Sequence, residues 1–134
     1  MTDSSRARSP IFPALRYADG HAAIAWLERA FGFAPQAVHD GPDGALAHAE
    51  LTSGDGLVML GSGSADPANP WSTTPMGLYV RVDDIDAHYA RAQAAGAEIV
   101  RPLAQTSYGA REYSARDPGG HLWSFGTYDP WAGK

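Results

Sequence analysis

The chain has 134 residues and a mass of 14.2 kDa, the size of one domain that can bury a core without covalent staples. Its net charge of −5 and pI of about 5.4 disfavour a nucleic-acid partner, and no apolar run is long enough for a membrane span. The absence of cysteine excludes disulfides, thiolate metal sites and cysteine nucleophiles. Residues 1–10 are polar and predict a loose leader on a cytoplasmic protein.

The first half of the chain predicts a strand, a helix and three more strands. Apolar residues recur at helical spacing before Gly32, and turn residues separate the short apolar runs on either side. The predicted elements are a strand at 11–17, a helix at 22–31 and strands at 33–38, 45–52 and 57–60. Residues 61–75 are rich in Gly, Ser, Pro and Asn and predict a linker loop, which contains Trp71.

The second half repeats this order. Its predicted elements are a strand at 77–82, a helix at 84–95 and strands at 98–102, 111–116 and 121–128. Three pairs share an offset of 64: Asp19 with Asp83, Gly32 with Gly96, and Gly56 with Gly120. A repeat on this scale indicates two copies of one supersecondary unit. We therefore predict an α+β fold with βαβββ modules at 11–60 and 76–130.

Two segments near the end of the chain carry a family resemblance. Residues 108–113 read Tyr-Gly-Ala-Arg-Glu-Tyr, and residues 117–125 read Asp-Pro-Gly-Gly-His-Leu-Trp-Ser-Phe. With the helix end at 26–33, they resemble the vicinal oxygen chelate superfamily, which includes glyoxalases, bleomycin-resistance proteins and ring-cleaving dioxygenases. The bleomycin-resistance-like branch is the most similar. The resemblance implies curled, cup-like sheets with helices outside, a homodimer that closes the cups, and a small organic ligand.

Metal-dependent members of this superfamily hold their metal on four strands inside the cup. By distance from the repeated residues, the corresponding positions are Phe12, Leu60, Gly77 and Ser124. None of these side chains is a competent ligand for a divalent metal, which needs several imidazole nitrogens or carboxylate oxygens. We therefore expect neither a metal nor another cofactor.

Strand alternation predicts which side chains face the cup. Apolar residues on the alternate positions of each strand should pack on the helices. The side chains left facing inward line a mixed apolar and polar surface, as small-molecule sites usually do. This predicted lining consists of Phe12, Arg16, His48, Glu50, Val58, Leu60, Tyr79, Arg81, Glu112, Ser114, Leu122 and Ser124. Tyr108, Arg111 and Trp71 are expected at the rim.

Several of these residues have alternative interpretations. Arg16 and Arg81 either contact the ligand or form structural ion pairs with Glu50 and Glu112. His48 and Glu50 either form a displaced metal set with Glu112 or supply a general base, His48. Trp71 either stacks on a planar ligand or packs on its own domain.

Other polar and aromatic residues are expected to be structural. His21, His39 and His88 should be solvated. Trp26 should lie between helix and sheet, and Asp117 should serve a tight turn.

The sequence thus predicts a metal-free small-molecule-binding protein, similar to bleomycin-resistance-type sequestration proteins. One alternative is a glyoxalase-like metal-dependent lyase or isomerase, or a dioxygenase. Another is a metal-free enzyme that uses His48 for proton transfer.

Overall fold

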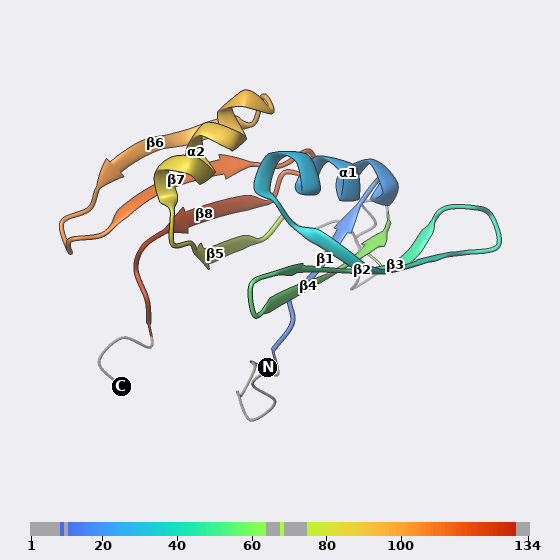
Figure 1. Cartoon of the computed structure of the whole chain (residues 1–134). Helices are drawn as coiled ribbons and strands as arrows, with labels where there is room; N and C mark the ends of the chain where they lie inside the picture. The colour runs from blue at the N-terminus through green and yellow to red at the C-terminus, as the bar shows by residue number, and fades with distance from the viewer. Residues whose placement is uncertain (1–8, 10, 64–67, 69–74, 131–134) are drawn as a thin grey trace.

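The computed structural model describes residues 9, 11–63, 68 and 75–130 (Figure 1). Most of the predicted leader, most of the predicted linker and Trp71 lie outside the described residues. Neither helix of the described part is long and apolar enough to cross a membrane.

The first module is a four-stranded sheet with one helix. Its strand order is β1-β4-β3-β2, with β1 parallel to β4 and the other neighbours antiparallel. The elements are β1 (Ala14–Tyr17), α1 (Gly20–Phe31), β2 (Ala34–Asp40), β3 (Leu46–Ser53) and β4 (Gly56–Ser62).

The second module has the same topology, with strand order β5-β8-β7-β6 and β5 parallel to β8. Its elements are β5 (Gly77–Arg81), α2 (Ile85–Ala94), β6 (Glu98–Gln105), β7 (Arg111–Arg116) and β8 (Leu122–Gly126). The predicted α+β fold of two βαβββ modules is confirmed.

The two helices begin at equivalent aspartates. Asp19 and Asp84 each accept a hydrogen bond from the backbone N–H three residues on, at 3.1 Å, which satisfies a free donor of the first turn. Asp19 therefore corresponds to Asp84 and not, as expected, to Asp83. Gly32 ends α1 in the left-handed conformation, with φ of 77°, where a Cβ would be strained.

A shared core joins the two modules. Helices α1 and α2 lie next to each other on one side of the sheets (Figure 1). Phe31 of α1 packs against Trp123 and Phe125 of β8, with ring centroids 5.6 and 4.6 Å apart. Trp26 is half-buried against Phe31, at 4.9 Å. The side of each sheet that faces away from the helices is called here its open face.

The pairing of β3 with β4 corrects the expected position of Leu60. Ala49 is buried on the helix side and pairs with Leu60, so Leu60 also faces the helices and is only 2% exposed. Val58, paired with buried Leu51, lies on the same side. Both were expected in the cup.

The physical reason is a longer turn in the second module. Thr52 pairs with Leu57 across residues 53–56, whereas its equivalent, Arg116, pairs with Leu122 across residues 117–121, which is one residue more. The offset of 64 that holds on β3 and β7 therefore becomes 65 on β4 and β8. Met59, opposite Glu50, takes the open-face place that Ser124 takes opposite Ser114.

The turn after β7 also holds the modules together. Asp117 Oδ1 accepts the backbone N–H groups of Gly119 and His121, so the predicted turn role is confirmed. Its other oxygen accepts the Tyr17 hydroxyl at 2.7 Å and the Trp123 indole N–H at 2.9 Å. Asp117 is thus a buried link between the modules as well as a turn residue.

His88 is a second link, and the expectation that it is solvated is wrong. Its Nε2 lies 3.1 Å from the Phe31 carbonyl oxygen, and its Nδ1 lies 2.6 Å from the Tyr113 hydroxyl. The carbonyl can only accept, so Nε2 carries the proton and Nδ1 accepts from Tyr113. Burial lowers the pKa of His88, which favours this neutral form.

Candidate functional site

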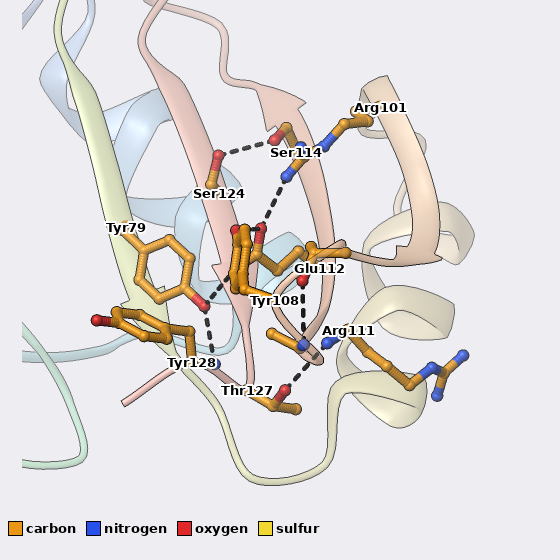
Figure 2. Close-up of polar contacts among 11 residues, drawn as sticks. Tyr79, Arg101, Tyr108, Arg111, Glu112, Ser114, Ser124, Thr127 and Tyr128 are labelled. Atoms are coloured by element: carbon orange, nitrogen blue, oxygen red, sulfur yellow. Dashed lines mark hydrogen bonds and ion pairs between the residues drawn. The ribbon is translucent and has the colours of Figure 1, made fainter. Parts of the chain in front are cut away.

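A buried carboxylate lies on the open face of the second sheet, near one end of the inner strands β7 and β8. Glu112 on β7 is 3% exposed. Its Oε2 accepts the Tyr79 hydroxyl at 3.0 Å, while its Oε1 accepts the Tyr108 hydroxyl at 2.7 Å and Arg101 Nη2 at 3.1 Å (Figure 2). Three donors from three segments therefore compensate for its removal from water.

The strand between Tyr79 and Glu112 makes this arrangement possible. Gly126 of β8 pairs with Glu112, and β8 lies between β5 and β7. A Cβ at Gly126 would lie 2.3 Å from the Tyr79 hydroxyl oxygen and 2.5 Å from the Glu112 Cγ. The Tyr79 side chain thus crosses the sheet over a position that has room only for hydrogen.

Both phenols next to the carboxylate have a raised pKa. Burial, followed by the hydrogen bond to Glu112, raises the pKa of Tyr79 to about 12. The hydrogen bond to Glu112 is the main cause that raises the pKa of Tyr108. These shifts reinforce the protonated state that tyrosine has at neutral pH, so both hydroxyls donate to the carboxylate.

Two small hydroxyls and a third tyrosine border the cluster. Ser114 and Ser124 lie opposite each other, with their Oγ atoms 2.7 Å apart. Tyr128 packs edge-on against Tyr79 and Tyr108, with ring centroids 6.4 and 5.9 Å apart. This part of the open face thus combines aromatic walls with a polar floor.

Two hollows meet at Tyr108. One has a volume of about 500 Å³ and extends from Tyr108 past Tyr128 to Arg81. The other, of about 270 Å³, lies between Arg101 and Tyr108 and reaches Glu112. Of the predicted residues, Glu112 and Tyr108 line these hollows, while Tyr79 bonds to Glu112 beside them and Ser114 bonds to Ser124 on the same face (Figure 2).

Arg81 and Arg111 pair with aspartates and not with Glu112. Arg81 pairs with Asp83 at 2.7 Å and with Asp129 at 3.7 Å, not with Glu112. Arg111 binds Asp86 at the start of α2, at 2.7 and 2.8 Å, and is thereby directed away from Glu112.

In the first module, Arg16 does not pair with Glu50. Its guanidinium lies against Gly61 and donates to the Ser62 carbonyl at 3.4 Å.

The open face of the first sheet carries a separate polar group. Glu50 accepts from Gln36 at 3.0 Å and lies 3.1 Å from His48 Nε2, while the His39 ring stacks on His48 at 6.3 Å. The hydrogen bond from Gln36 and then that from His48 lower the pKa of Glu50. Glu50 is therefore a hydrogen-bonded carboxylate next to an imidazole.

The donor set does not fit a divalent metal. In the described part of the chain, no three His, Asp or Glu side chains converge on one point. His48 and Glu50 lie on the first sheet and Glu112 on the second, so the displaced metal set is wrong. Three of the four expected positions, Phe12, Gly77 and Ser124, together offer one hydroxyl as a ligand. At the fourth position, the residue that faces the open side is Met59 and not Leu60.

The sequence analysis missed Arg101, the only cation bound to Glu112 in the described residues. Its strand was expected to end at Pro102, but β6 continues to Gln105 through two register shifts. Arg101 pairs with Ser114, a predicted site residue, so correct strand pairing would have placed it beside the site.

Comparison with known proteins identifies the family. A model of the Glyoxalase/Bleomycin resistance protein/Dioxygenase superfamily matches residues 12–125. The chain belongs to this superfamily. Two mycobacterial proteins, Mb0911c of Mycobacterium bovis and Rv0887c of Mycobacterium tuberculosis, are 35% identical over 122 residues. These matches cover 85% of this chain and 80% and 71% of the two relatives.

Solved structures show the same fold. TioX from Micromonospora sp. ML1 is 37% identical with a TM-score of 0.77, over 88% of this chain and 97% of TioX. A lactoylglutathione lyase from Agrobacterium tumefaciens has a TM-score of 0.69 at 22% identity, over 95% and 99% of the two chains. The latter likeness concerns the fold alone, since one fold supports many chemistries.

Proposed function

We propose that this superfamily member binds a small organic molecule on the open face of its second sheet, without a resident metal, as a bleomycin-resistance-type sequestration protein would. The observation that carries the proposal is the buried, triply hydrogen-bonded Glu112 beneath exposed tyrosines, next to hollows of about 500 and 270 Å³. Apolar walls around a few fixed polar groups are typical of small-molecule sites.

We further propose that two copies pair to close the site. Within the described part of the chain, Tyr79, Tyr108 and Tyr128 remain exposed on the open face of the second sheet. A symmetric pair would cover these rings, and such pairs are the commonest oligomers. Light scattering should give about twice the chain mass of 14.2 kDa at micromolar concentration; a stable monomer would refute this part of the proposal.

A second candidate function is metal-independent proton transfer by His48. It is favoured by the 3.1 Å contact between His48 Nε2 and Glu50, which orients the imidazole on the open face of the first sheet. Histidine titrates near neutral pH and is a common general base. Turnover of any compound that the protein binds, lost in His48→Gln but present in Glu112→Gln, would favour this function over sequestration.

Native mass spectrometry combined with elemental analysis tests the binding proposal. The protein is incubated with a library of small organic compounds and then desalted. We expect a retained organic mass and no stoichiometric zinc, iron or manganese. One metal ion per chain, together with binding that a chelator abolishes, would instead favour the metal-dependent lyase, isomerase or dioxygenase.

A further inference from the structure

The two oxygens of Glu112 are held by different kinds of partner. Oε2 binds Tyr79, whose hydroxyl end lies over Gly126 of β8. Oε1 binds Tyr108 and Arg101, whose side chains are 62% and 53% exposed. Of the donors at Oε1, the Tyr108 hydroxyl can turn into solvent while Arg101 stays on the carboxylate, whereas the Tyr79 hydroxyl at Oε2 lies over Gly126.

Tyr108 also separates the two hollows. It lines both of them and stands over Glu112 from the turn between β6 and β7 (Figure 2). In that turn Gly109 has φ of 83°, and the Thr106 backbone N–H donates to the Ala110 carbonyl at 2.7 Å. Rotation of the Tyr108 side chain away from this fixed turn would uncover Oε1 and leave the space between the hollows free.

We propose that the Tyr108 side chain is a built-in place-holder and that the ligand takes its place with the same chemistry: a planar aromatic ring that carries a hydrogen-bond donor for Glu112 Oε1. This inference rests on the proposed binding function and names its ligand class. The ligand's donor is a phenolic hydroxyl or an amine, and its ring lies against Tyr128.

The local charges favour a donor over an anion. The Arg101 guanidinium is already paired with Glu112, and Arg81 is paired with Asp83 and Asp129. A carboxylate or phosphate group at Oε1 would face the Glu112 carboxylate and has no proton to donate. A phenol or an ammonium group would restore the hydrogen bond that Tyr108 gives up.

The experiment removes the place-holder and supplies its missing part. Tyr108→Ala is titrated with phenol and, separately, with benzoate, and binding is followed by amide shifts at residues 111–114 and 124–127. We expect the affinity of Tyr108→Ala for phenol to be about tenfold higher than that of the wild type. We expect the affinity of the same variant for benzoate to be at least about tenfold lower than its affinity for phenol. A factor of about ten corresponds to one hydrogen bond to a charged acceptor. Tyr128→Ala is the control, because its ring lies in the same cluster and no described hydrogen bond joins its hydroxyl to Glu112; it should show no gain.

Equal phenol affinity in Tyr108→Ala and the wild type, or equal affinity for phenol and benzoate, would overturn the inference. In the wild type itself, excess phenol should shift the NMR signals of the Tyr108 ring, and benzoate should not. This measurement tests the inference even if the variant unfolds. If the protein retains an organic ligand at Glu112 but shows no preference for hydrogen-bond donors, the inference is refuted and the proposed function is not. Failure of the wild type to retain any compound, with phenol still filling Tyr108→Ala, would refute the proposed function alone.

Discussion

The hydroxyl of Tyr79 reaches the carboxylate of Glu112 by crossing Gly126, the residue of β8 that lies between their strands. Substitution Gly126→Ala places a methyl group 2.3 Å from that hydroxyl, so the tyrosine or the glutamate must move. We expect a loss of about 1–3 kcal/mol in the free energy of unfolding, as in other overpacked sites. Urea denaturation measures it.

Gly77→Ala is the matched control on the same face of the same sheet. A Cβ at Gly77 would meet nothing closer than the Leu122 carbonyl oxygen at 4.0 Å. Its free energy of unfolding should stay within about 1 kcal/mol of the wild type. Equal losses in the two variants would show that Tyr79 does not depend on the space over Gly126.

The hydrogen bond from Tyr17 to Asp117 should stabilise the contact between the modules. Burial and the nearby Asp117 raise the pKa of Tyr17, so its hydroxyl stays a donor. Tyr17→Phe leaves this oxygen of the buried carboxylate with the Trp123 indole as its remaining described donor, and should cost about 1–3 kcal/mol in unfolding free energy. Tyr89→Phe is the control, because the described residues provide no hydrogen bond to its hydroxyl. A loss no greater than in Tyr89→Phe would contradict the role assigned to Asp117.

Acid should weaken the fold partly through His88. Burial lowers the pKa of this residue below its ordinary value of 6.5, so the unfolded chain takes up a proton before the folded one does. The contribution of His88 is therefore complete above about pH 6.5 and falls as the pH drops below that value. His88→Gln should show a flatter dependence of unfolding free energy on pH between about 7.5 and 5.

Tyr113→Phe separates titration from hydrogen bonding in that measurement. It removes the hydroxyl next to Nδ1 but keeps the burial that is the main cause of the lowered pKa of His88, so it should retain most of the pH dependence of the wild type. An unchanged slope in His88→Gln would show that other groups cause the acid sensitivity.

Local sequence patterns predicted the helices, the strands and their faces, because a few neighbouring residues determine each of these features. The alternation of Glu112 and Ser114 with Tyr113 assigned the two faces of β7, and the contacts agree: Glu112 bonds to Tyr79 and Ser114 to Ser124, whereas the Tyr113 ring lies against His88 of α2. Positions that depend on exact turn length were less predictable. Because the turn before β8 is one residue longer than the turn before β4, the offset of 64 placed Leu60 on the wrong face. The offset between the helix starts is also 65, which pairs Asp19 with Asp84.

The partners within the candidate site depended on contacts between distant segments. Glu112 was predicted to face inward, but sequence spacing does not indicate that Arg101, rather than Arg81, reaches it. His88 looked solvated because it lies on a short helix with many polar neighbours, yet that helix packs against α1 and the core aromatics. Such pairings arise from the packing of the two modules and have no local signature.

The central claim is that Glu112 binds an organic molecule without a metal. Affinity selection of a small-molecule library by chelator-treated protein, read by mass spectrometry, tests it most directly when the wild type, Glu112→Gln and Glu50→Gln are compared. Glu50→Gln makes the same chemical change on the open face of the other sheet. We predict that the wild type and Glu50→Gln retain the same compound and that Glu112→Gln loses most of it. Retention that is equal in all three proteins, or that requires added metal, would contradict the claim.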